Sequence, residues 1–190
     1  MKAKTIVHTF MVVLGFLPTL LAPAENIQNM TYEQFKEKIS VISKQAGELT
    51  AASTLLSNAE FRALSEHADE YQLLGEQFIS DKVPTAQKAM VIYAMENLSF
   101  DKYVSFIREM LTLTKKGRID SGLLELALIP GFEWNTMLED NYKSEKVVQL
   151  IRDLKASKVL TQDCFNYLSQ VESGESAKEV QKMRSNGELP

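Results

Sequence analysis

The segment ENLSFDKYVSFIREM at residues 96–110 recurs as DNYKSEKVVQLIRDL at residues 140–154, an offset of 44 residues. Asparagine, lysine, valine, isoleucine and arginine recur identically, acids replace acids, and Phe106 is replaced by another apolar residue, Leu150. Both faces of an amphipathic helix are therefore preserved. A self-match of this length is typical of stacked helix pairs, and it predicts an irregular antiparallel helix-pair stack.

Apolar residues at helical spacing, bounded by capping residues, predict helices along the rest of the chain. Thr31 and Gln34 form a capping box, while Asn58, Ser99 and Thr161 can each cap a later helix. No stretch alternates with period two for long enough to form a strand, so the predicted class is all-α. The expected helices cover residues 31–46, 58–78, 84–98, 99–117, 120–128, 144–156 and 162–171.

Two of these helices resemble the HEAT-type family of helical repeats. The likeness rests on an alanine-rich first helix and an aliphatic second helix, with Ala86, Ala89, Ala94 and Leu98 in the first and Asp101, Val104, Ile107 and Leu111 in the second. It covers roughly 75 residues and implies a protein-binding surface without chemistry. The segment 120–128 is short for a first helix, and 130–135 interrupts the unit. A short HEAT-like solenoid and a compact helical bundle both stay open.

The beginning of the chain has the pattern of a secretory signal peptide. Lys2 and Lys4 precede an uncharged apolar stretch that ends in the small residues before Glu25. Cleavage is expected between Ala24 and Glu25, which gives a signal peptide at 1–24, one helical domain at 25–172 and a polar tail at 173–190. The alternative is an uncleaved membrane anchor. The expected location is periplasmic or secreted, with membrane contact only through the signal segment.

Composition excludes several classes of function. Removing Lys2 and Lys4 lowers the formal net charge from −4 to −6, which disfavours a nucleic-acid partner. Cys164 is the only cysteine and is expected to be a small buried side chain. His67 is the only histidine after residue 24, and the glycines form no phosphate-binding cluster. No cofactor, metal site or catalytic residue is therefore expected.

Three residue patterns keep other functions open. His67 and Glu70 lie one helical turn apart and could hold a metal, although a solvated helix face explains them better. Glu125 and Glu133 are the carboxylates to inspect for a cell-wall glycan hydrolase, since two acids suffice for that reaction. A Met-rich interior suggests a carrier of small apolar ligands, although methionine more often fills irregular gaps.

The segment 129–134 is the one place where large aromatic residues occupy an expected loop. Phe132, Glu133 and Trp134, together with Tyr142, are the candidate contact residues for a protein partner. The preferred function is therefore that of an exported, non-catalytic protein that binds another protein. An immunity protein that neutralises a toxin and an envelope adaptor are the two roles considered.

Overall fold

The computed structural model describes residues 30–46, 55, 57–129 and 136–189. These residues form helices and no strand, which confirms the all-α class. The expected signal peptide and its cleavage point at Ala24 and Glu25 lie outside the described residues. The helices are α1 (Tyr32–Ala46), α3 (Ala59–Glu66), α4 (Ala68–Ser80), α5 (Thr85–Ala94), the 3₁₀ helix η2 (Met95–Asn97), α6 (Phe100–Lys115), α7 (Ser121–Leu128), α8 (Met137–Asp140), α9 (Glu145–Ser157), α10 (Gln162–Ser173) and α11 (Glu175–Ser185).

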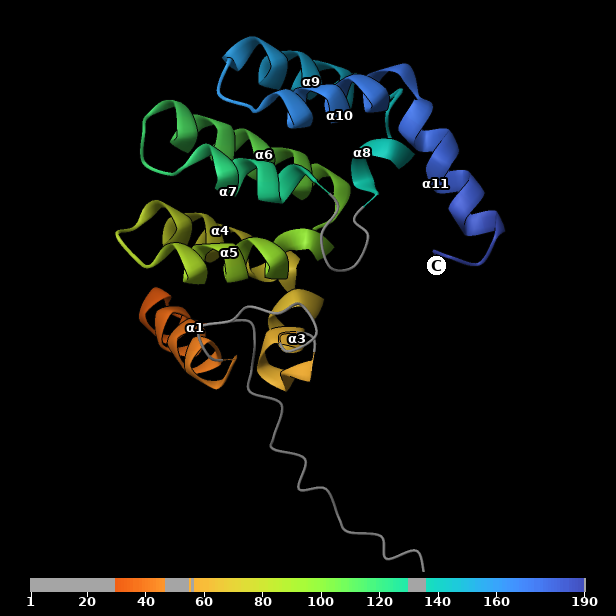
Figure 1. The fold of residues 1–190 in the computed structure, drawn as a ribbon. Helices are drawn as coiled ribbons and strands as arrows, with labels where there is room; N and C mark the ends of the chain where they lie inside the picture. Colours follow the sequence, from red (N-terminus) through yellow and green to blue (C-terminus); the bar gives the residue numbers. More distant parts are fainter. Residues whose placement is uncertain (1–29, 47–54, 56, 130–135, 190) are drawn as a thin grey trace, which may run out of the picture.

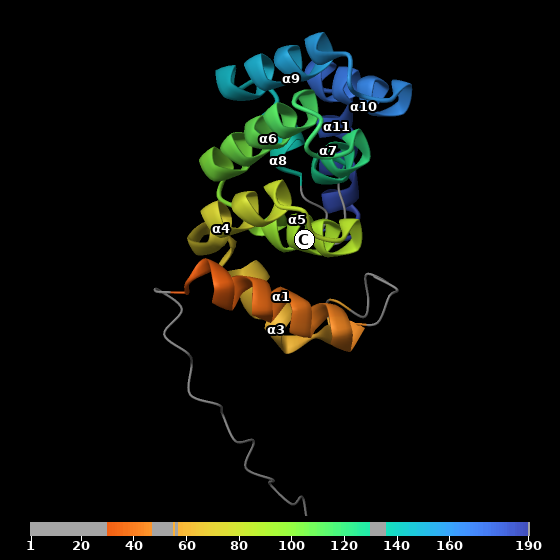
Figure 2. The same cartoon turned by 90° about the vertical axis from the view of Figure 1, so that its left-hand side faces the viewer.

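The helices are arranged as layers of antiparallel pairs (Figure 1). Short turns join α4 to α5, α6 to α7 and α9 to α10, and the helices of each pair pack against each other. Helices α4, α6 and α9 form one column of the stack, and α5, α7 and α10 form the other (Figure 2). Helices α1 and α3 lie beside the α4–α5 pair at one end of the stack. The predicted helix-pair stack is therefore present.

The two copies of the self-match form α6 and α9, which occupy the same column in neighbouring layers and pack on each other. The spacing is irregular, because α6 begins 32 residues after α4, whereas α9 begins 45 residues after α6. The longer interval contains residues 129–144, including α8. Helices α5 and α6, which carry the HEAT resemblance, belong to adjacent layers, and membership of that family stays a prediction.

Most of the predicted helix ends are confirmed at atomic detail. The Thr31 backbone N–H donates to Gln34 Oε1 at 2.8 Å, and the Gln34 N–H donates back to Thr31 Oγ1 at 3.3 Å. Asn58 Oδ1 accepts a hydrogen bond from the N–H of Phe61, the third residue of α3. Thr161 Oγ1 accepts one from the N–H of Cys164, the third residue of α10. Ser99 precedes α6 as expected, but its side chain makes no capping hydrogen bond.

The single helix expected over 58–78 is wrong, because the chain breaks at His67 into α3 and α4. The apolar stripe is continuous in sequence and buried on both sides of the break. Helices α3 and α4 both contact α1, α5 and η2, and α4 in addition packs on α6. Figure 1 shows that α3 and α4 run in different directions, so one straight helix could not occupy both positions. The expected helix over 84–98 likewise changes into the 3₁₀ helix η2 after Ala94.

Within the expected polar tail at 173–190, residues 175–185 form a helix, α11. Gly174 has a φ of 75°, which an L-residue rarely adopts, and it ends α10 and begins α11. Helix α11 packs against α10 and α8. The segment is polar, as its sequence shows, but contacts with the rest of the chain hold it as a helix. The described helical domain therefore extends past residue 172.

Burial of apolar side chains holds the layers together. Phe35 and Phe78 are almost fully buried, with ring centroids 5.9 Å apart in an edge-on arrangement that joins α1 to α4. Cys164 is fully buried, as expected, and burial raises the pKa of its thiol to about 12. Among the described residues, no helix is long and apolar enough to cross a membrane.

We expect Thr161→Ala to lower the free energy of unfolding by about 1–2 kcal/mol, because Thr161 Oγ1 accepts from the Cys164 N–H and its hydroxyl donates to Glu125 Oε2. The matched control is Ser144→Ala, since Ser144 stands at the same position before α9 but makes no side-chain capping bond. That change is expected to cost less than about 0.5 kcal/mol. Urea unfolding followed by circular dichroism measures both. Equal losses would contradict this account of the α10 cap.

Candidate functional site

The insertion, residues 129–144, is the part of the stack that departs from its regular construction. In sequence it lies between α7 and α9, and its described residues, 129 and 136–144, lie at the edge of the stack opposite the short turns and include α8. Residues added to one connection of a repeated helical scaffold commonly form its binding face. The insertion is therefore the candidate functional site. Residues 130–135 lie outside the described residues.

Glu139 on α8 is a buried carboxylate at the base of the insertion. Its side chain is 3% exposed, and Oε1 accepts a hydrogen bond from the Tyr167 hydroxyl on α10 at 2.7 Å. Within the described part of the chain, Oε2 has no hydrogen-bond partner. Burial raises the pKa of Glu139, and the bond from Tyr167 offsets only part of that effect. The insertion is thus anchored by an incompletely satisfied polar group.

Tyr103 and Cys164 are buried, and with Glu139 and the partly buried Tyr167 they form what we call the buried polar cluster. The Tyr103 hydroxyl donates to the backbone carbonyl of Ala127 at 2.9 Å, which joins α6 to α7. Burial, reinforced by the nearby Glu139 carboxylate, raises the pKa of both tyrosines. These phenols remain protonated over the ordinary pH range and act as hydrogen-bond donors. The cluster positions the insertion; it holds no activated nucleophile.

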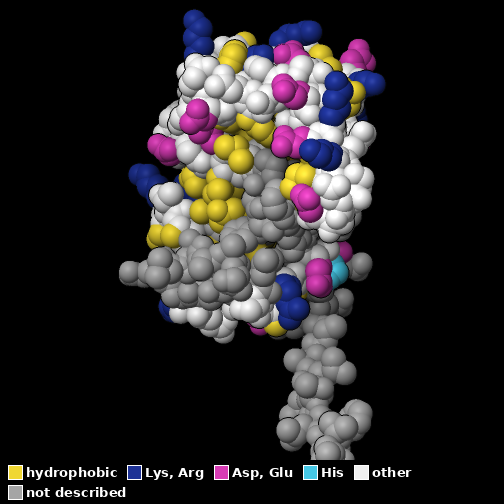
Figure 3. All heavy atoms as spheres, turned by 45° about the vertical axis from the view of Figure 1, so that its right-hand side comes forward, with side chains coloured by type: hydrophobic (Ala, Val, Ile, Leu, Met, Phe, Trp, Pro, Cys, Tyr) yellow, Lys and Arg dark blue, Asp and Glu magenta, His cyan; other side chains and the backbone are white. Residues whose placement is uncertain are grey.

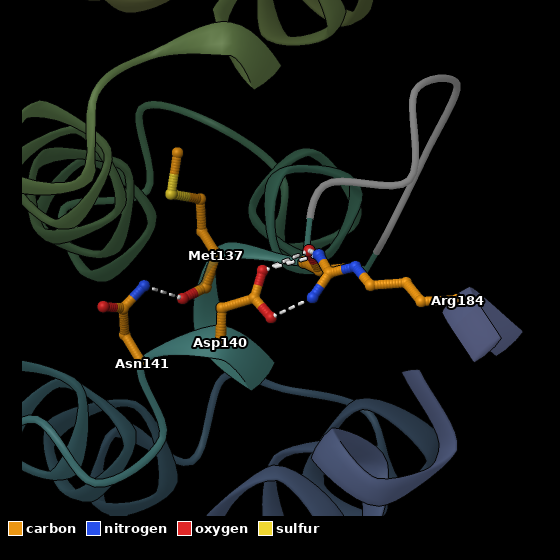
Figure 4. Close-up of polar contacts among 5 residues, drawn as sticks. Met137, Asp140, Asn141 and Arg184 are labelled. Carbon is orange, nitrogen blue, oxygen red and sulfur yellow. Dashed lines mark hydrogen bonds and ion pairs between the residues drawn. The ribbon is translucent and has the colours of Figure 1, made fainter. Parts of the chain in front are cut away.

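Asp140 connects the insertion to α11 through an arginine (Figure 4). The Arg184 guanidinium donates to Asp140 Oδ1 at 2.6 Å and to Oδ2 at 2.8 Å, and it also donates to Thr136 Oγ1 at 2.8 Å. The Thr136 hydroxyl donates to Asp140 Oδ2 at 2.7 Å, so the acceptors are fixed relative to each other. The hydrogen bonds from Arg184 lower the pKa of Asp140. This bidentate geometry suits a guanidinium specifically.

The predicted contact residues fall within the insertion, but only Tyr142 can be placed. Phe132, Glu133 and Trp134 lie outside the described residues. Tyr142 is half-buried, and its ring lies directly against Gly174, where α10 passes into α11. The approach is so close that a Cβ at Gly174 would lie 2.5 Å from Tyr142 Cε2. The sequence did not indicate Glu139 or Arg184, since a lone acid and an arginine in a polar tail resemble ordinary surface charges.

The other carboxylates singled out from sequence have structural partners. Glu125 Oε1 accepts from the Thr161 N–H at 2.6 Å, and Oε2 accepts from its hydroxyl at 2.9 Å, which ties α7 to the start of α10. Glu133, its proposed partner in hydrolysis, lies outside the described residues. His67 Nδ1 lies 3.3 Å from Glu70 Oε1. The described residues contain no group of three or more metal-binding side chains.

Hydrophobic side chains are exposed near the insertion. Ile129, its first residue, is 44% exposed, and Leu126 on α7 and Met137 on α8 are partly buried. Figure 3 turns this edge toward the viewer and shows a patch of hydrophobic side chains at mid-height beside the residues that are not described, with charges of both signs scattered around it. Such patches with a polar surround are typical of protein-interaction surfaces.

Comparison with protein-family models, with curated proteins and with solved structures found no match for this chain. No activity is therefore carried over from a relative, and the function is inferred from the arrangement of its own residues.

We expect Glu139→Gln to change how stability depends on pH. The pKa of Glu139 is raised in the folded state, so the folded protein retains this proton above the unfolded pKa of about 4.3. The contribution of protonated Glu139 to the stability of the folded protein is fully present below the unfolded pKa and is lost as pH rises through the folded pKa. Glutamine does not titrate, so the variant does not undergo this loss. As pH rises, the unfolding free energy of Glu139→Gln should therefore increase relative to that of the unchanged protein.

Urea unfolding of both proteins from about pH 4 to about pH 8 measures this difference across the window set by the unfolded pKa. Glu76, whose pKa is also raised by burial, is present in both proteins and cancels in the comparison. A constant difference over the whole range would show that Glu139 titrates normally.

Proposed function

We propose that this chain is an exported, non-catalytic protein that binds another protein through the edge of the stack formed by the insertion and α11. A layered helical stack holds its connections on a rigid base, and such connections commonly make the contacts with partners. Neutralisation of a toxin by an immunity protein and envelope assembly by an adaptor are the two roles that we consider. Both require a shaped surface and no chemistry.

The observation that carries the proposal is the position and construction of the insertion. It lengthens one connection of an otherwise regular stack, and a buried carboxylate and a guanidinium contact fix it to α10 and α11. Folding gains little from an incompletely paired buried carboxylate, because its desolvation is unfavourable. Departures from regular packing of this kind are expected where a protein has a functional surface.

The described side chains also support a role without catalysis. Both oxygens of Glu125 are used by Thr161, and the Cys164 thiol is buried with a raised pKa, which makes it a poor nucleophile. The buried methionines fill contacts between helices: a Cβ on Gly75 would lie 3.3 Å from Met95 Sδ. These contacts favour a packed scaffold over a hydrolase or a carrier of apolar ligands.

For export, we predict that the full chain expressed in a Gram-negative host is recovered from the periplasm or the medium, beginning at Glu25. The reason is the positively charged start, apolar centre and small residues before the junction. Intact-mass measurement of the fractionated protein identifies its first residue. A variant that lacks residues 2–24 is the control and should stay in the cytoplasm. Recovery of the uncleaved chain from the cytoplasm would contradict export.

For binding, we predict that a photo-crosslinking amino acid at position 129 captures a partner protein in the native host, whereas the same amino acid at position 41 does not. Ile129 is 44% exposed and Val41 is 41% exposed, so the two positions present similar side-chain area. Val41 lies on α1, at one end of the stack. Mass spectrometry identifies the adduct. Equal capture at both positions, or none at position 129, would contradict binding through the insertion edge.

A further inference from the structure

Helix α11 differs from the other described helices in how it is attached. None of its residues belongs to the main hydrophobic core, which draws on every other described helix of the stack. Only Ser176 and Ala177 are buried within α11, and Leu189, four residues after its end, is buried as well. The free energy that holds a helix in place comes mainly from its buried apolar face. Helix α11 therefore adds little to the stability of the layers.

The contacts that hold α11 lie mainly at its two ends. At the start, Gly174 adopts a left-handed conformation and packs closely on the Tyr142 ring. Near the end, Arg184 binds Asp140 and Thr136, and this ion pair is about 40% exposed on both sides, at 38% and 41%. Exposed ion pairs are weak, although bidentate geometry strengthens them. A helix held in this way opens locally at a lower cost than unfolding of the stack.

The surface beneath α11 is suited to one chemical group. Asp140 and Thr136 present their acceptors to a guanidinium, and the hydrogen bond between them fixes the arrangement. Asn141 Nδ2 donates to the Met137 carbonyl at 2.9 Å, which stabilises the short helix that carries Asp140 (Figure 4). Because these contacts lie within the insertion, the acceptors stay in place when α11 leaves. A lysine does not reproduce the planar fork of an arginine.

We propose that α11 is a latch that opens about Gly174 while the stack stays folded, and that an arginine of the partner protein then takes the place of Arg184 on Asp140 and Thr136. This inference rests on the proposed function, since the surface that the latch uncovers belongs to the same edge. Arg184 competes from within the chain, at an effective concentration in the millimolar range, so only a partner with further contacts on the insertion displaces it.

Hydrogen exchange of the purified mature protein tests the latch without any partner. Arg184→Ala is expected to speed exchange in residues 175–189 by roughly three- to fivefold and to leave α4, α6 and α9 unchanged. The matched control is Lys155→Ala, which removes an ion pair with Glu172 between α9 and α10 and should not affect α11. An unchanged α11, or faster exchange in all helices together, would overturn the latch.

A peptide with the sequence of residues 173–190 tests the chemistry of the site. Full-chain Arg184→Glu places a carboxylate beside Asp140 and opens the latch, and fluorescence anisotropy then measures binding of the labelled peptide. The peptide that carries Arg184 is expected to bind at least about fivefold more tightly than the same peptide with lysine at that position, because lysine loses the bidentate contact. Equal binding by the two peptides, or none by either, would overturn the guanidinium site.

The position-129 crosslink separates this inference from the proposed function. Two proteins are compared, both with the crosslinking amino acid at position 129 and one of them also with Arg184→Ala. If α11 competes with the partner, the protein with Arg184→Ala gives the higher yield of adduct. A yield that is unchanged or lower overturns the competition but leaves the proposed function supported. Absence of any adduct in both proteins contradicts the proposed function, while hydrogen exchange and the peptide still report on the latch.

Discussion

The packing of α6 between α4 and α9 is the contact on which the rest of the structure depends. Ile107 on α6 and Ile151 on α9 are both fully buried and occupy matching places in the 44-residue self-match. Burial of each such side chain contributes about 1.5–3 kcal/mol, and the column repeats this contact from layer to layer. Without that continuous column, the insertion would have no rigid base from which to present its side chains.

The insertion uses this base in two ways. On its inner side, Glu139 accepts the Tyr167 hydroxyl and fixes α8 against α10. On its outer side, Asp140 binds Arg184 and places α11 over the edge of the stack. Two adjacent acids of one short helix thus have opposite environments: burial raises the pKa of Glu139, whereas Arg184 lowers that of Asp140. The buried environment of Glu139 favours a permanent anchor, whereas the partly exposed ion pair of Asp140 favours a contact that can be exchanged.

The remaining side-chain environments are consistent with a protein that binds a partner through the shape of its surface. The tyrosines and the cysteine of the buried polar cluster are held protonated by burial, and the carboxylate of Glu125 is committed to the start of α10. Ile129, the first residue of the insertion, is exposed, and Figure 3 shows a patch of hydrophobic side chains on this side of the stack. A rigid stack, an added connection and a weakly held helix over it form a surface whose accessibility α11 can control.

Sequence by itself determined the all-α class and most helix boundaries, because helical periodicity and capping residues are local signals. The 44-residue self-match predicted a helix-pair stack but left a compact bundle open. The sequence also directed attention to residues 129–134 and Tyr142. Only the tertiary structure decided the break at His67, the helix within the expected tail and the roles of Glu139 and Arg184. Each depends on a residue distant in sequence: Arg184 meets Asp140 across 44 positions, and Glu139 meets Tyr167 across 28. Side-chain spacing along one helix carries no information about such partners.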